Sequence, residues 1–166
     1  MIQMYRFRKA NLSKVLSIIA VVGLSISISN NLLASEAGHD KHHFVGIFVG
    51  VFDADENDTV VGLEYEYKFN SQWGVGAVYE DASDAHHGDG VSSKIAAVYF
   101  HPSGGWRLGA GFGSETVGGH ESESLYRYGV SYEFHIGGVG VEPSLNFDTV
   151  DGETVEVYGV ALVWAF

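Results

Sequence analysis

The chain of 166 residues contains no cysteine and only two prolines. Without cysteine it can form neither disulfide bonds nor thiolate metal sites, and no residue can carry a cysteine-linked lipid anchor. Basic residues are scarce, because nine Lys and Arg stand against 21 Asp and Glu and give a formal net charge of −12. Proteins that bind nucleic acid contact its phosphates through Lys and Arg, so this charge balance argues against a nucleic-acid partner.

The chain also lacks an apolar segment as long as a membrane-spanning helix. Its main apolar run, from Val15 to Ile28, has 14 residues, whereas a spanning helix needs roughly 20. Basic residues precede this run, and the small residues of Ala34–Ala37 follow it. This order is typical of a secretory signal peptide. We therefore expect residues 1–37 to be a signal peptide cleaved after Ala37, with Ala34 as the second choice, rather than an uncleaved anchor.

From residue 38 onward, apolar and polar residues alternate in segments of about ten residues. Such alternation is the pattern of β-strands whose two faces meet different surroundings. We therefore expect a single all-β domain over residues 38–166. Its eight expected strands are His43–Phe52, Thr59–Phe69, Trp73–Ala82, Ser92–His101, Trp106–Glu115, Ser124–Ile136, Val139–Phe147 and Glu153–Phe166.

The expected strands form a repeat of hairpins whose connections alternate in length. Trp73–Tyr79 and Trp106–Phe112 follow one template, 33 residues apart. Three connections, at 70–72, 102–105 and 137–138, are tight turns of residues that tolerate turn geometry. The other four, at 53–58, 83–91, 116–123 and 148–152, are longer and acidic. Short turns at one end and longer loops at the other are the arrangement of an outer-membrane barrel.

The last expected strand carries large apolar residues at every second position and finishes on Phe166. With the alternation and the two kinds of connection, residues 38–166 resemble the small eight-stranded outer-membrane β-barrels, such as the transmembrane domain of outer-membrane protein A and the X-type barrels. The resemblance implies an eight-stranded antiparallel up-and-down transmembrane β-barrel. It also implies that Tyr158, Trp164 and Phe166 belong to a sorting signal read by the barrel-assembly machinery.

One face of the expected strands is apolar and aromatic, and the other face carries the charges. We expect the apolar face to meet lipid, with aromatic residues near both membrane interfaces. The charged face then lines the interior, where charges are tolerated only when they are paired and hydrogen-bonded. We expect Arg107 to lie near the short turns and Arg127 to lie nearer Glu64 and Glu80. The expected interior network comprises Glu64, Glu66, Lys68, Glu80, Arg107, Arg127, Glu133, His135 and Glu142.

Histidine and acidic residues in the second long loop are candidate ligands for a transition metal. His86, His87 and Asp89 combine imidazole with carboxylate, a donor set that suits Zn²⁺, Cu²⁺ or Ni²⁺. Adjacent histidines on an extended chain point to opposite faces, however, and the spacing matches no closed site. The sequence therefore favours solvated polar loops over a specific metal centre.

The first long loop nearly matches a calcium loop of the EF-hand type. Asp53, Asp55 and Asn57 occupy the first three ligand positions, and Glu64 occupies the twelfth. Asp58 stands where the sharp turn needs glycine, and strands rather than helices flank the segment. We expect no resident cofactor here, and at most weak binding of divalent cations by the loop carboxylates.

An eight-stranded barrel is just wide enough to be filled by its own side chains, which argues against a diffusion porin and against catalysis in the lumen. We therefore expect a monomer in the outer membrane of a Gram-negative bacterium, surrounded by lipid and lipopolysaccharide, that is not an enzyme. Its role is structural, or it binds at the surface through acidic, His-containing extracellular loops. Two alternatives remain: an outer-leaflet lipid-modifying enzyme, and a soluble periplasmic β-barrel that binds a small ligand.

Overall fold

The computed structural model describes residues 41–53, 57–83, 85, 89–118 and 120–166, with the side chains of Asp53 and Asn57 left out. The expected signal peptide and its cleavage site lie outside these residues. Among the described residues, no helix has the length and apolar character needed to cross a membrane. The strands are β1 (His43–Asp53), β2 (Asn57–Lys68), β3 (Trp73–Ala82), β4 (Val91–Phe100), β5 (Trp106–Val117), β6 (Glu123–Tyr132), β7 (Phe134–Ile136), β8 (Val139–Val150) and β9 (Glu153–Ala165).

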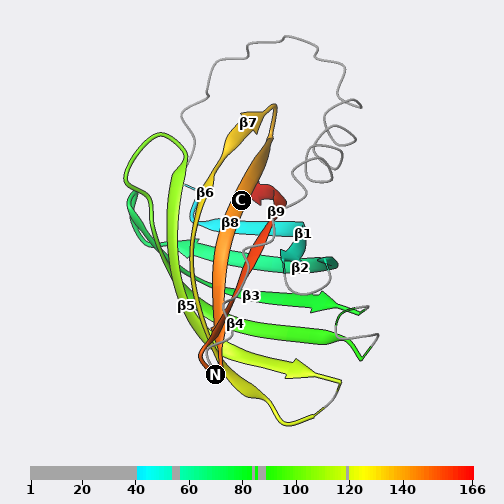
Figure 1. Ribbon diagram of the computed structural model, residues 1–166. Coiled ribbons are helices and arrows are strands. Elements are labelled where there is room, and N and C mark those ends of the chain that lie inside the picture. Colours follow the sequence, from blue (N-terminus) through cyan, green and yellow to red (C-terminus); the bar gives the residue numbers. More distant parts are fainter. Residues whose placement is uncertain (1–40, 54–56, 84, 86–88, 119) are drawn as a thin grey trace, which may run out of the picture. The chain divides into compact units, whose positions relative to one another are not determined.

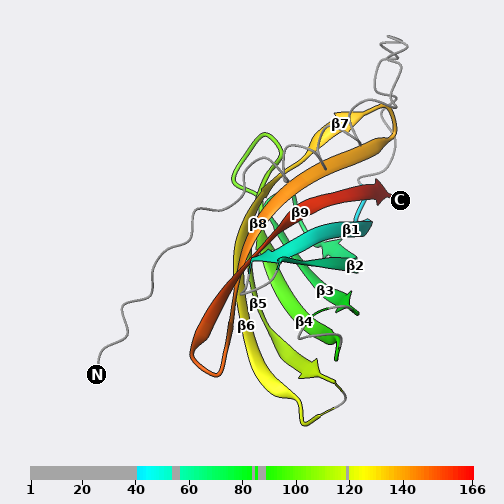
Figure 2. The ribbon, with the colours of Figure 1, turned by 45° about the vertical axis from the view of Figure 1, so that its right-hand side comes forward.

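The strands form one antiparallel sheet that closes on itself. Each of β1 to β5 pairs with the next strand along the chain, β8 pairs with both β6 and β9, and β9 returns to pair with β1. Because β6 and β7 are two parts of one wall and β6 pairs with β8, the sheet closes into a barrel with eight positions (Figures 1 and 2). This result confirms the expected all-β, eight-stranded antiparallel barrel. Closure satisfies the backbone groups that an open sheet edge would leave unpaired.

The wall breaks between β6 and β7 at Glu133. Its amide donates to the carbonyl of Gly105 at 2.9 Å instead of to a neighbouring strand. Beyond this point β7 pairs only with β8, so the two strands form a narrow hairpin at the top of the ribbon in Figure 1. Residues 134–136 are all exposed. The hairpin therefore extends past the part of the wall that encloses a lumen.

The connections define two ends of the barrel. The end with the turns at 69–72, 101–105 and 137–138 is called the turn end here, and the opposite end is called the loop end. One expectation at the loop end is wrong: residues 148–152 are not a long loop. Strand β8 continues to Val150, and only Asp151 and Gly152 join it to β9, with φ values of 48° and 84°. Two positive φ values in a two-residue connection are the mark of a tight hairpin turn.

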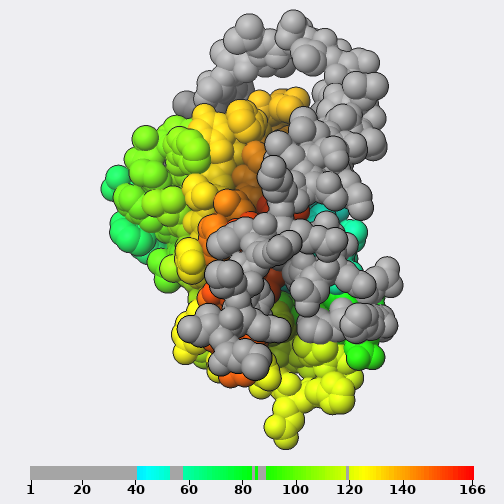
Figure 3. Space-filling model, in the orientation of Figure 1, coloured from blue at the N-terminus to red at the C-terminus, as the bar shows by residue number. Residues whose placement is uncertain are grey.

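The apolar face points outward on β2, β3, β5 and β6, as expected. Leu63, Trp73, Phe112 and Tyr126 are between 42% and 57% exposed. Figure 3 shows the outside of the wall in space-filling form, with green to yellow atoms on its left. A soluble barrel would need the same aromatic face to line its interior, so the arrangement is that of a barrel surrounded by lipid.

Candidate functional site

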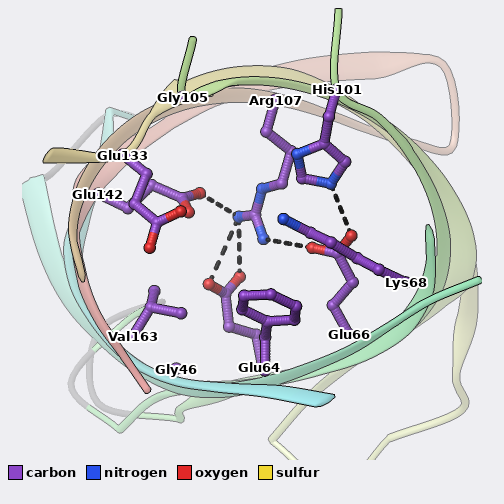
Figure 4. A pocket seen from close by; sticks show the side chains of 11 residues that line it. Gly46, Glu64, Glu66, Lys68, His101, Gly105, Arg107, Glu133, Glu142 and Val163 are labelled. Carbon is purple, nitrogen blue, oxygen red and sulfur yellow. Dashed lines mark hydrogen bonds and ion pairs between the residues drawn. The ribbon is translucent and has the colours of Figure 1, made fainter. Parts of the chain in front are cut away.

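The interior of the barrel near the turn end is built around Arg107 on β5. Its guanidinium lies 3.1 Å from Glu64, 3.5 Å from Glu66 and 2.5 Å from Glu142, measured from nitrogen to the nearest carboxylate oxygen in each pair. Figure 4 shows the three carboxylates converging on this one side chain from different parts of the wall. The side chains are between 5% and 13% exposed. In surroundings this dry, an unpaired carboxylate costs several kcal/mol, so the arrangement requires all of its partners.

Two further basic residues complete the turn-end cluster. His101 Nε2 lies 2.7 Å from Glu66 Oε1, so Glu66 is held by both His101 and Arg107 (Figure 4). Lys68 reaches the same region and places its Nζ over the ring of Phe44, 4.1 Å from the ring centroid. Such a cation–π contact attracts the ammonium group to the face of the ring.

A second cluster surrounds Arg127 on β6. Its Nη1 and Nη2 donate to the two oxygens of Glu80 at 2.7 and 2.6 Å, and its Nε and Nη2 donate to the two oxygens of Asp148 at 2.6 and 2.5 Å. All three side chains are less than a tenth exposed. A guanidinium that binds two carboxylates through paired hydrogen bonds is the strongest ion-pair geometry available to these side chains.

Apolar and aromatic side chains occupy the rest of the lumen. Tyr99 lies beside the turn-end cluster, with the Arg107 Cζ atom 4.6 Å from its ring centroid. Towards the loop end, Phe52, Val60 and Val157 pack with one another, and Ala85 from the second loop joins this cluster with only 3% of its surface exposed. The described side chains therefore occupy the lumen, with the Arg107 cluster near the turns and the Arg127 cluster and the apolar residues nearer the loops.

The spaces that remain among the described lumen residues are small. One cavity beside Arg107 has a volume of about 10 Å³, and another between Tyr99 and Arg127 has a volume of about 40 Å³. A single water needs roughly 10–15 Å³ measured in the same way, so these cavities hold one water and a few waters respectively. Neither has room for an organic substrate.

The structure brings many of the expected interior residues together in the lumen, and two of them lie elsewhere than expected. Glu64 pairs with Arg107 rather than lying nearer Arg127, because residue 64 stands two pairs nearer the turn end than Glu80 on the ladder that joins β2 to β3. His135 is not an interior residue, since 70% of its side chain is exposed. The alternation does place it on the inner side, but it lies on the β7 hairpin, beyond the enclosed lumen. Its contact is with Glu133 at 3.3 Å.

Two partners of the network were missed in the sequence. Asp148 had been assigned to a loop, yet it continues the inward series of Glu142, Ser144 and Asn146 at every second position. His101 is the last residue of the expected strand Ser92–His101, and the expected network does not include it. The same two-residue period that assigns Tyr99 to the interior assigns His101 there as well.

The candidate metal ligands fall mostly where the structure gives no side chains. Asp55, His86 and His87 lie outside the described residues, as do the side chains of Asp53 and Asn57. Asp89 is exposed. A Cβ atom on Gly118 would lie 3.2 Å from the Cβ of Asp89 and 3.3 Å from the Cδ2 of His120, so Asp89 and His120 are near each other. Among the described residues, no three His, Asp or Glu side chains are placed to hold a metal ion. Glu64, the twelfth position of the calcium-like loop, is held in the lumen by Arg107.

The expected sorting-signal residues all lie on the outer face of β9 and just after it. Trp164 is 38% exposed and Phe166 is 64% exposed, whereas Val157 and Ala161 on the alternate positions are buried in the lumen. Phe166 also joins the two ends of the described domain. Its amide donates to the carbonyl of His43 at 2.9 Å, and its ring stacks on that of His43 with centroids 5.5 Å apart.

No family model matches the chain, and no curated protein matches it. Three solved structures share its architecture. The outer-membrane protein Ail of Yersinia pestis, in a phospholipid bilayer nanodisc, is 16% identical over 76% of this chain and 100% of its own, with a TM-score of 0.52. The N-terminal β-barrel domain of Pseudomonas aeruginosa OprF is 15% identical over 76% and 98%, with a TM-score of 0.50. The outer-membrane enzyme PagL is 16% identical over 74% and 99%, with a TM-score of 0.52.

These identities establish the fold and nothing finer. The described chain has the fold of the small eight-stranded outer-membrane β-barrels, with an apolar outer surface and a polar lumen. One of the similar structures is called an enzyme, so the fold alone does not decide whether this chain has an activity.

Proposed function

We propose that this chain, which has the fold of the small outer-membrane barrels, is a monomeric outer-membrane protein whose lumen is plugged and whose loop end faces the outside of the cell. Its role is structural, or it binds at the surface through the acidic loops. The observation that carries this proposal is the filled lumen. Because Arg107 and Arg127 each cross the interior to bind carboxylates on other strands, solutes have no continuous path.

The outer surface supports residence in a bilayer, with lipid and lipopolysaccharide around the barrel. Aromatic side chains gather near the turn end, where Trp73 packs with Phe100 and Trp106 packs with Tyr132. Such belts lie at membrane interfaces. We infer that short turns face the periplasm, as they do in barrels of this kind, and that the barrel-assembly machinery inserts the chain.

Conductance across a planar bilayer tests the plugged lumen. The refolded wild-type protein is expected to give no steady open level, whereas Arg107→Ala combined with Arg127→Ala is expected to conduct, since it removes both side chains that cross the lumen. Insertion is checked separately by the change in electrophoretic mobility on boiling in SDS, because a closed barrel resists detergent until it is heated. A stable conducting state of the wild-type protein would overturn the proposal.

Orientation is tested with epitope tags at the two ends. A tag inserted after Gly152 is expected to be labelled by antibody on intact cells, and a tag inserted after Gly137 is expected to be labelled only after the outer membrane is opened. Both positions have positive φ and open space around them, so either insertion disturbs the wall little. The reverse labelling pattern would place the loop end in the periplasm and remove the proposed surface role.

An outer-leaflet lipid-modifying enzyme is the second candidate. Ser114, Ser122 and Ser124 line a groove on the outer surface, where an enzyme acting on lipid would need its nucleophile. The hydroxyl of Ser122 lies 2.7 Å from that of Thr116, and among the described residues no hydrogen bond joins a serine to His120. A serine nucleophile needs an adjacent base, so the geometry favours the non-enzymatic role. Release of fatty acid from outer-membrane lipids on overexpression would reverse this preference.

A further inference from the structure

Lys94 on β4 has surroundings unlike those of the other basic residues. The described domain has five Lys and Arg, and Arg107 and Arg127 are inside the lumen. Lys41 and Lys68 lie at the turn end, where Lys41 Nζ donates to the carbonyl of Ala165 at 3.0 Å and Lys68 lies over Phe44. Lys94 is exposed on the outer face, and it makes no ion pair among the described residues. It is thus the one cation that the described domain presents to lipid near the loop end.

Hydroxyl groups surround this cation. In the sheet register Lys94 stands opposite Tyr79 on β3 and Ser114 on β5, and Ser114 stands opposite Ser124 on β6. These residues share the outer face, because facing partners on paired strands point to the same side. The row therefore presents one ammonium group with three hydroxyl groups, which are hydrogen-bond donors suited to phosphate oxygens.

The next row towards the turn end is hollow. Ala77 and Ala96 face each other there, between Tyr65 on one side and Phe112 on the other. Two methyl groups between two large aromatic rings leave a trough with an apolar floor. This trough belongs to an open groove of about 990 Å³ that extends to Lys94, Ser114 and Ser124, a volume at the upper end of the roughly 300–1,000 Å³ typical of ligand sites.

We propose that this groove binds a phosphorylated lipid of the outer leaflet, with its phosphate on Lys94 and the neighbouring hydroxyls and one acyl chain in the Ala77–Ala96 trough. The inference rests on the proposed orientation of the barrel in the outer membrane. Charge complementarity selects the ligand, since an uncharged headgroup would leave Lys94 without a partner at the edge of the apolar band. The occupant is a lipid because the trough next to the charge is apolar and lies on the outer face of the barrel.

Acidic residues fix where the phosphate lies. Asp81 stands one row nearer the loop end, opposite Ser92, and Glu123 also lines the groove. Both repel a phosphate that is placed further towards the loops. The favourable position is therefore the row of Lys94 itself, which puts the acyl chain of the same lipid into the trough beneath.

Native mass spectrometry of the detergent-purified full domain measures this binding directly. The probes are diphosphoryl lipid A and the same lipid with its phosphates removed. We expect a one-to-one complex with the phosphorylated probe, and at least about tenfold weaker binding of the dephosphorylated one, as the loss of one charge-assisted contact implies. Equal binding of the two probes, or binding of neither, overturns the proposal.

Variants separate the charge from the trough. Lys94→Gln is expected to weaken binding of the phosphorylated probe about tenfold, and Lys94→Arg is expected to retain it, since Arg also binds phosphate. Ala96→Phe fills the trough and is expected to weaken binding of both probes. Lys41→Gln is the matched control, because it removes an exposed lysine at the other end, and it is expected to change nothing. An equal loss in Lys41→Gln would reduce the effect to net charge alone and would overturn the proposal.

The same mass spectra distinguish lipid binding from other uses of the groove, and the test for folding distinguishes a failure of this inference from a failure of the proposed function. A dimer mass that disappears in Ala96→Phe would show that a second copy covers the groove, and a probe that loses an acyl chain would show that the groove catalyses hydrolysis. Either result replaces lipid binding. Each sample is first tested for the mobility change on boiling, so a folded barrel without bound lipid removes only this inference and leaves the proposed membrane barrel in place.

Discussion

Arg127 binds Glu80 through two parallel hydrogen bonds of 2.7 and 2.6 Å across the interior of the barrel. The two residues lie on β6 and β3, which are not neighbours in the sheet, so this contact spans the lumen rather than the wall. Asp148 on β8 occupies the remaining donors of the same guanidinium. One side chain thus joins three strands across the inside of the barrel.

Arg127→Met is expected to destabilise the barrel by about 3–5 kcal/mol, because it leaves Glu80 and Asp148 buried without a cation. Replacing all three residues by apolar ones is expected to restore most of the lost stability, since no buried charge is then left unpaired. The measurement is the urea concentration at the midpoint of unfolding, where the folded fraction is detected by its mobility change on boiling. Equal stability of Arg127→Met and the wild-type protein would mean that water reaches the carboxylates.

The fold could be predicted because apolar and polar residues alternate along a strand whether or not the exact ends of the strand are known. Strand β3 begins and ends at the predicted residues, and the aromatic face of β2, β3, β5 and β6 is the outer face as expected. A period of two fixes which face a residue belongs to once one residue is placed. What the period does not give is where a wall stops enclosing a lumen. His135 has the correct parity, but it lies beyond the enclosed part.

The pairing inside the lumen could be predicted only in part. Which carboxylate meets which arginine depends on the stagger between strands, and the sequence does not state this stagger. Glu64 and Glu80 are both inner residues of adjacent strands, yet two steps of the ladder separate them, so they join different clusters. Asp148 was missed for a different reason: its strand continues further than the acidic composition of 148–152 suggested.

Gly76→Ala is expected to destabilise the barrel by about 1–3 kcal/mol, as overpacking of a closed core does. A methyl group at this position would meet the carbonyl oxygen of Tyr65, and it would lie 2.9 Å from the ring of Tyr99. Gly138→Ala is the matched control, since nothing lies within 4 Å of its position. Both variants are compared by urea midpoint. Similar midpoints would show that Tyr99 moves aside at little cost.

Gly152→Val is expected to cost about 1–2 kcal/mol, because a β-branched residue disfavours the left-handed backbone conformation that Gly152 adopts at φ 84°. Asp151→Asn is expected to be neutral, since Asn and Asp both tolerate positive φ in such turns. Both variants are refolded into detergent, and their stabilities are compared by the same electrophoretic mobility change. A neutral Gly152→Val would mean that the turn between β8 and β9 can change its conformation freely.

Phe166→Ala is expected to lower the amount of barrel assembled in cells while leaving the refolded protein stable in detergent. The backbone hydrogen bond between residue 166 and His43 does not need the ring, whereas a sorting signal does. Assembled protein is counted in the outer-membrane fraction as the heat-shifting band. Tyr67→Ala serves as the control, because Tyr67 is another exposed aromatic near the turn end. If both variants assemble equally poorly, the loss reflects the aromatic belt rather than a signal.

Zn²⁺ is expected to bind the loops weakly, with no saturable one-to-one site. Asp89 and His120 lie near each other, but two exposed ligands on separate loops hold a metal ion loosely unless further donors complete the shell. Isothermal titration of the refolded protein with Zn²⁺, and separately with Ca²⁺, checks this expectation. Micromolar binding of one Zn²⁺ that disappears in His86→Ala combined with His87→Ala would contradict it, because those side chains would then complete the site. A Ca²⁺ signal removed by Asp55→Asn would instead locate binding in the first loop, without Glu64, which Arg107 holds inside the lumen.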